Sequence, residues 1–170
     1  MKYLSLLLFI GIIFYSCSSL SVKNGSAVKT IEKKARATIS YKSYNFLQKS
    51  SKKQAELEMW SKDKFKKFKK SIPKGGMIVV NIEGITVDTA NLEWWSYVVK
   101  DLKGNEIKRQ KGEKDTPEYT VSDRGTIWWN IDIIRMEKEI SSPFQVFVID
   151  KLLKKRSSFV VYPNQTEIKE

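Results

Sequence analysis

The second half of the chain, from Met77 onward, alternates apolar and polar residues in short runs. A period of two is typical of strands that bury one face. The clearest run covers 126–134, and the residues on its apolar face, which we predict to point into the core, are Ile127, Trp129, Ile131 and Ile133.

Similar β-prone runs recur along the rest of the chain, at 36–42, 77–83, 92–101, 107–111, 116–121, 144–149 and 158–162. Turn signals such as Gly104-Asn105 and Ser142-Pro143 separate them. The runs follow one another without helices long enough for parallel crossovers. The pattern therefore predicts a mainly β chain with one N-terminal amphipathic helix, folded as an antiparallel β-sandwich-like domain.

The predicted helix covers 51–72. Ser51 and Gln54 fit a capping box, and Pro73 prevents the helix from continuing. At 100° per residue one side carries a broad apolar stripe, formed by Leu57, Trp60, Phe65, Phe68 and Ile72. The remaining surface is crowded with lysines, namely Lys62, Lys66, Lys67, Lys69 and Lys70.

Two interpretations of this helix stay open. Its stripe can cover a face of the sheet, which is the commoner use of such a pattern. A basic amphipathic helix with Trp and Phe can also lie in a membrane interface. In that case Trp60 and the five lysines form a contact surface for a membrane or a partner protein.

The first seventeen residues resemble an export signal. Lys2 is followed by twelve almost wholly apolar residues at 4–15, too few to span a bilayer. Phe14-Tyr15-Ser16-Cys17 is similar to the lipobox of bacterial lipoproteins, in which a small residue precedes a cysteine that is lipidated. The resemblance implies a lipid on Cys17 and a place in the bacterial cell envelope, the outer membrane before the inner. The alternative is an ordinary secretory signal or N-terminal anchor with an incidental cysteine.

The pattern divides the chain into four parts. We expect a signal peptide at 1–16, a Ser-rich tether at 17–35, a single β-sandwich-like domain at 36–163 and a polar tail at 164–170.

Charge is concentrated near the predicted anchor. Residues 23–74 carry sixteen basic and four acidic side chains, a formal charge of +12, whereas 75–170 sum to −1. A cationic segment beside a lipid anchor favours anionic lipid head groups. The alternative is a solvated lysine face, and an exported protein is not expected to bind nucleic acid.

The chain offers little conventional catalytic chemistry. It has no histidine, and Cys17 is its single cysteine. These absences disfavour Ser-His-Asp and Cys-His nucleophiles and the usual zinc sites, so we expect no cofactor and no metal. Acidic residues near predicted loops lack a calcium-loop pattern; they are Asp88, Asp101, Asp123 and Asp150. The sequence favours a non-catalytic binding or scaffolding module, with a carboxylate-based extracytoplasmic hydrolase as the weaker alternative.

Two tryptophan pairs suggest a further binding mode. Neighbouring strand residues point to opposite faces, so we assign Trp95 and Trp129 to the core. Trp94 and Trp128 then share the other face. Exposed there, they form an aromatic platform for a glycan or a partner protein. Covered by the helical stripe, they are structural.

Overall fold

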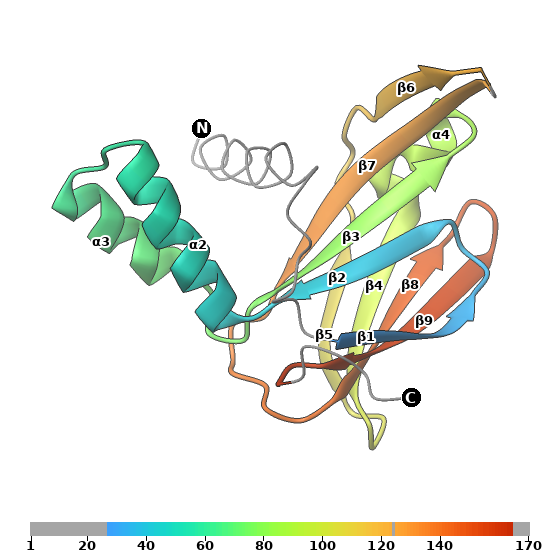
Figure 1. The fold of residues 1–170 in the computed structure, drawn as a ribbon. Helices are drawn as coiled ribbons and strands as arrows, with labels where there is room; N and C mark the ends of the chain where they lie inside the picture. The colour runs from blue at the N-terminus through green and yellow to red at the C-terminus, as the bar shows by residue number, and fades with distance from the viewer. Residues whose placement is uncertain (1–26, 124, 165–170) are drawn as a thin grey trace.

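The computed structural model describes residues 27–123 and 125–164, folded as two antiparallel sheets that face each other (Figure 1). Sheet A has the strand order β1 (Ala27–Lys33), β9 (Lys155–Tyr162), β8 (Phe144–Asp150), β4 (Trp95–Asp101), β5 (Glu106–Lys111). Sheet B has the order β2 (Ala37–Lys42), β3 (Met77–Gly84), β7 (Gly125–Arg135), β6 (Glu118–Ser122). The prediction of a mainly β, sandwich-like fold is confirmed at this level. The expected signal segment, Cys17 and the end of the expected tail lie outside the described residues.

Strand β1 corrects the expected extent of the tether. It pairs with β9 along its length, so 27–33 belong to sheet A and are not a spacer. The turn that follows leads directly into β2 of sheet B. Its backbone is held by Ser157 of β9, whose buried hydroxyl accepts the N–H groups of Lys34 (3.1 Å) and Ala35 (2.9 Å).

The core fills the space between the sheets. Its fully buried side chains come from both inner faces, and the largest are Trp95, Tyr97, Phe144, Ile78, Ile82 and Ile134. Trp95 therefore takes the core place predicted for it, at 1 % exposed. On β3, Ile78, Val80 and Ile82 point inward, and they pair with β7 residues that must share that face.

This pairing shows that the predicted inner face of β7 is wrong. Ile134, Asp132 and Asn130 lie opposite the inward residues of β3, so the even-numbered side of β7 points inward. The predicted core residues lie on the outer face; Ile127 is 47 % exposed, and Trp129, Ile131 and Ile133 are half-buried. The outer face of β7 is thus apolar, while its inner face carries two polar side chains.

The predicted single helix over 51–72 is also wrong. Two helices, α2 (Tyr44–Leu57) and α3 (Lys62–Ser71), form a hairpin. Met59 adopts a left-handed φ of 50°, and Ser61 caps the start of α3. Ser51, expected to cap the helix, instead lies buried inside α2.

Two short helices, α4 (Val87–Ala90) and η1 (Leu92–Trp94), connect β3 to β4. Within the described ranges, no helix is long and apolar enough to cross a membrane.

Candidate functional site

The α2–α3 hairpin is the feature that departs most from a plain sandwich. It stands between β2 and β3 in the sequence and projects from one end of sheet B (Figure 1). No side chain of α3 is classed as buried, and α2 buries Leu47 and Ser51. The expectation that the helix covers a face of the sheet therefore holds for the base of the hairpin alone.

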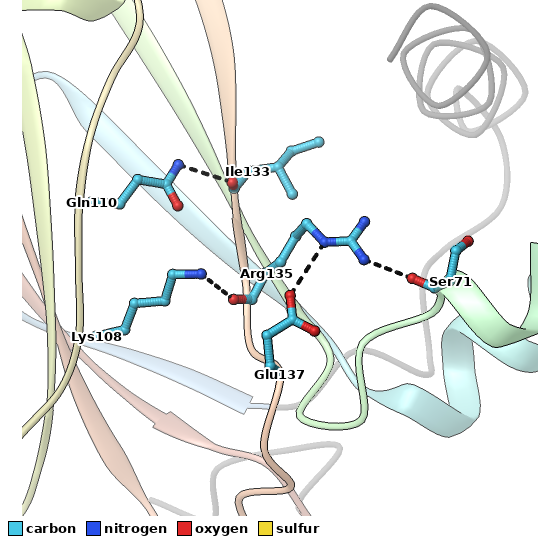
Figure 2. A network of polar contacts seen from close by, with 6 residues as sticks. All are labelled: Ser71, Lys108, Gln110, Ile133, Arg135 and Glu137. Carbon is cyan, nitrogen blue, oxygen red and sulfur yellow. Dashed lines mark hydrogen bonds and ion pairs between the residues drawn. The ribbon is translucent and has the colours of Figure 1, made fainter. Parts of the chain in front are cut away.

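The base is fixed by a small apolar cluster and one polar contact. Leu47, Ile72 and Met77 are its buried members, and Ile133 of β7 packs against them. Figure 2 shows the Arg135 side chain reaching from the end of β7 to α3, where its Nη2 donates to the Ser71 carbonyl at 2.6 Å. The hairpin is consequently anchored at one end.

The tip of the hairpin is apolar and exposed. Leu57 is 77 % exposed and Met59 is 90 % exposed, both in the turn region between the helices. The Trp60 ring packs edge-on against Phe68 at 5.2 Å, and its Nε1 donates to Glu58 at 2.5 Å. This places two large apolar side chains in solvent at the point farthest from the anchored base.

Lysines are dense along the whole hairpin, and Lys69 and Lys70 lie in the last turn of α3, at its anchored end. Residues 44–74 contain ten lysines against three acidic residues, a formal charge of +7. The predicted contact lysines are all exposed; they are Lys62, Lys66, Lys67, Lys69 and Lys70. The ion pairs within the described part of the chain involve none of them. A further lysine, Lys64, lies with its ammonium 4.3 Å from the centre of the Trp60 ring, a cation–π contact.

The outer side of α2 adds a second basic feature, an open hollow of about 500 Å³. Three lysines contribute to its lining, together with polar groups that can donate hydrogen bonds: Lys49, Lys52, Lys53, Ser43, Asn45 and Ser50. Phe46 and the carboxylate of Glu56 complete the lining, so the hollow carries three positive charges and one negative charge.

The predicted aromatic platform is divided between two elements. Trp94 ends η1 and is 39 % exposed, whereas Trp128 lies half-buried in β7. The Trp128 ring packs against Tyr119 of β6, with centroids 5.1 Å apart and planes inclined at 49°. The helices contact sheet B at Met77 and Ile133, at the other end of the strands, so their stripe does not pack on Trp128.

The acidic residues considered as calcium ligands do not converge. Asp101 is the last residue of β4 and pairs with Phe144 of β8. Asp150 is the last residue of β8 and pairs with Trp95, at the other end of β4. Asp101 accepts hydrogen bonds from Asn105, and Asp150 accepts from the Leu153 N–H. Across the described ranges, no group of three or more His, Cys, Asp or Glu side chains is placed to hold a metal ion.

A buried polar cluster between the sheets was missed by the sequence prediction. Tyr97 of β4 is 1 % exposed and Asn130 of β7 is 8 % exposed, with Asp132 beside them. The Tyr97 hydroxyl, Asn130 Nδ2 and Asp132 Oδ2 are buried without a hydrogen-bond partner among the described residues. Asp132 Oδ1 is satisfied, because it accepts the Ile133 N–H at 2.7 Å.

Burial makes this cluster electrostatically unfavourable when it is charged. It raises the pKa of the Asp132 carboxyl. The Ile133 N–H and the nearby Tyr97 hydroxyl oppose this rise, whereas the charges of Glu113 and Asp115 reinforce it. Burial also raises the pKa of the Tyr97 hydroxyl, as does the negative charge of Asp132. The sequence prediction had placed Asn130 and Asp132 on the solvent face of β7, because it assigned the wrong face of this strand to the core.

The cluster borders a stretch of β7 beyond the end of β6. Here side chains of β5 bind the free carbonyls of β7, as Figure 2 shows: Gln110 Nε2 donates to Ile133 (3.1 Å) and Lys108 Nζ to Arg135 (2.6 Å). These bonds join sheet A to sheet B where no strand continues the ladder. The arrangement closes this end of the sandwich.

Comparisons with protein-family models, with curated proteins and with solved structures find no match for this chain.

Proposed function

We propose that this chain is a non-catalytic module of the bacterial cell envelope that attaches to an anionic membrane surface through its α2–α3 hairpin. The observation that carries the proposal is the α2–α3 hairpin, whose tip exposes Leu57 and Met59 and whose α3 exposes lysines along its length. A lipid on Cys17, implied by the lipobox resemblance, is the second attachment.

The geometry of α3 supports a surface contact. At 100° per residue, Lys62, Lys66, Lys69 and Lys70 share an arc of about 100° that turns away from the Trp60–Phe68 contact. Each lysine near an anionic surface contributes about 1 kcal/mol of binding free energy.

The proposed hairpin contact and the proposed lipid would act together, because each alone is a weak attachment. A single acyl chain binds membranes only marginally, and stable anchoring takes a second signal such as a basic surface. The hairpin supplies this signal without spanning the bilayer.

The test is vesicle binding by the full chain carrying Cys17→Ser, which removes any lipid. We expect binding to vesicles with anionic lipid, weak binding to neutral vesicles, and a loss as salt rises. Replacing Lys62, Lys66, Lys69 and Lys70 by Gln should weaken binding by about a hundredfold at low salt, from about 1 kcal/mol per lysine and incomplete additivity.

The matched control replaces four exposed lysines outside the hairpin by Gln: Lys103, Lys111, Lys114 and Lys154. It has the same net charge as the hairpin variant, so equal losses from both would contradict a specific role for the hairpin. Changing Leu57 and Met59 to Ser should weaken binding while leaving its salt dependence unchanged, because only apolar burial is removed.

The lipid is tested separately in cells. Detergent-phase partitioning of the wild type that Cys17→Ala abolishes supports lipidation, and identical partitioning of the two refutes it.

A further inference from the structure

Strand β6 is an open sheet edge within the part of the chain that the structure describes. It pairs with β7 along one side, and among the described residues no strand pairs with its other side. All five of its residues are exposed, including Tyr119 at 61 % and Val121 at 70 %. Such an edge is a template for another strand.

The edge strands of sheet A, β1 and β5, carry features that discourage pairing with another strand, and β6 lacks these features. β1 has a bulge between Thr30 and Glu32, and β5 carries Lys108, Arg109 and Lys111 with an irregular register opposite β4. β6 has the sequence Glu-Tyr-Thr-Val-Ser, without lysine, internal proline or register shift. Bulges and edge lysines discourage edge pairing, so their absence leaves β6 competent for it.

The direction of the free backbone groups follows from β7. The N–H of Met136 bonds to Gly76, so even-numbered residues of β7 hydrogen-bond toward β3. Odd-numbered residues, such as Ile127, then bond toward β6, where Thr120 is the partner. The N–H and C=O groups of Tyr119 and Val121 consequently point to the free edge.

We infer that β6 pairs antiparallel with β6 of a second copy of this chain, with Thr120 on the two-fold axis. In this register Tyr119 of one copy lies opposite Val121 of its partner, and each such pair exchanges two N–H···O bonds. Aromatic–β-branched and Thr–Thr pairs are both favourable across strands.

The competing registers are worse. A shift of the partner by two residues toward its N-terminus places Val121 opposite Pro117, which has no N–H to donate. A shift of four residues sets Glu118 opposite Glu118 of the partner, a like-charge pair. The shift of two residues the other way sets Tyr119 opposite Asp123, beyond the end of β6. Only the register centred on Thr120 uses every free group of the edge.

This pairing joins the two copies of sheet B into one continuous sheet. Its two-fold axis is perpendicular to the sheet, so the outer faces of both copies lie on the same side. Met77 and Ile133, which hold the hairpin, lie on that face. The dimer therefore presents both hairpin bases on one side, although the pairing itself does not depend on membrane binding.

Disulfide trapping of the full chain tests the register. In a Cys17→Ser background, Thr120→Cys places two thiols at a non-hydrogen-bonded pair, with Cα atoms about 4.5 Å apart, within disulfide range. Ser122→Cys is the matched control, because its two copies lie about 14 Å apart in this register. We expect mild oxidation to cross-link the Thr120→Cys protein at least about tenfold faster than the control.

A second substitution tests the hydrogen bonds. Val121→Pro removes an N–H that points to the free edge and keeps those used in the β6–β7 ladder. We expect Thr120→Cys with Val121→Pro to keep wild-type circular dichroism and lose its cross-linking. Equal cross-linking at 120 and 122, no cross-linking at 120, or cross-linking that survives Val121→Pro would each overturn the inference.

Discussion

The buried carboxyl of Asp132 makes a stability prediction with a defined sign. Its Oδ2 is buried without a hydrogen bond of good geometry, and the neighbouring Tyr97 hydroxyl stabilises its charge only partly against the burial. Leaving a buried polar atom unsatisfied costs about 1–3 kcal/mol. In Asp132→Asn the Oδ1 acceptor for the Ile133 N–H is retained, and the new amide N–H₂ can donate to Tyr97. We therefore expect the variant to be about 1–2 kcal/mol more stable than the wild type at pH 7.

The pH dependence follows from the raised pKa of Asp132 in the folded state. The folded protein keeps the carboxyl proton to a higher pH than the unfolded chain, whose Asp pKa is about 3.9. The contribution of Asp132 to the free energy of unfolding is thus fully present at a pH below its pKa in the unfolded chain. It is lost as the pH rises through its higher pKa in the folded protein. The Asp132→Asn variant has no carboxyl here and does not lose this stability. The difference in unfolding free energy between variant and wild type should therefore be small at pH 4 and grow toward pH 7.

Urea unfolding followed by tryptophan fluorescence measures both quantities. Subtracting wild type from variant at each pH cancels the contributions of other carboxyls, such as Glu106, whose pKa is lowered by Arg109. Asp123→Asn is the control, since it removes the same charge from an exposed turn and should change stability by less than about 0.5 kcal/mol. A variant that is less stable at pH 7, or an advantage that is equal at pH 4 and pH 7, would refute the reasoning.

Two further substitutions test the packing of the sandwich. Ser157→Ala leaves the buried Ala35 N–H without its acceptor and should cost about 2 kcal/mol in a urea titration, whereas an unchanged midpoint would contradict this role. Gly112→Ala places a Cβ 2.2 Å from the Leu92 carbonyl oxygen and should cost about 1–3 kcal/mol. Gly104→Ala is its control, because that Cβ meets nothing within 4 Å and only the positive φ is strained; a larger loss at 104 than at 112 would argue against the close approach.

The strands could be predicted from the sequence because their signal is local. The runs at 77–83 and 144–149 match β3 and β8 to within a residue, since alternation and turn residues mark both ends. β1 was missed for the opposite reason. The strand, Ala-Val-Lys-Thr-Ile-Glu-Lys, has a bulge between Thr30 and Glu32 that interrupts the period of two.

The inner face of β7 could not be predicted from periodicity. Ile133 and Ile134 are adjacent, so an apolar residue is available in either phase. The outer phase is the more apolar one, and Ile133 there is partly covered by the helices. Helix contact accounts for Ile133 alone, because Ile127 on the same face is 47 % exposed. The more apolar face of this strand is therefore the outer one, and its own sequence does not reveal that.

The break between α2 and α3 was hidden by a similar coincidence. Leu57 and Trp60 continue the phase of the apolar stripe across the turn, so the pattern looks like one helix. The available signal was Ser61, a capping residue followed by Asp63 in the first turn of α3. The lysines of the candidate contact surface were predicted as exposed, whereas exposure of Leu57 and Met59 depends on this turn.

The place of the hairpin in the ladder supports the proposal that it binds a surface. β2 and β3 pair directly up to Lys42 and Met77, so a short turn would connect them. The chain instead inserts residues 43–76, whose ordering costs conformational entropy. Among the described residues, these helices bury apolar surface against the sandwich in the small cluster around Leu47 and Ile72. At the tip, Leu57 and Met59 stay in solvent. Such a segment buries little apolar surface against its own core. The proposed membrane contact would cover Leu57 and Met59 and neutralise the exposed lysines of α3.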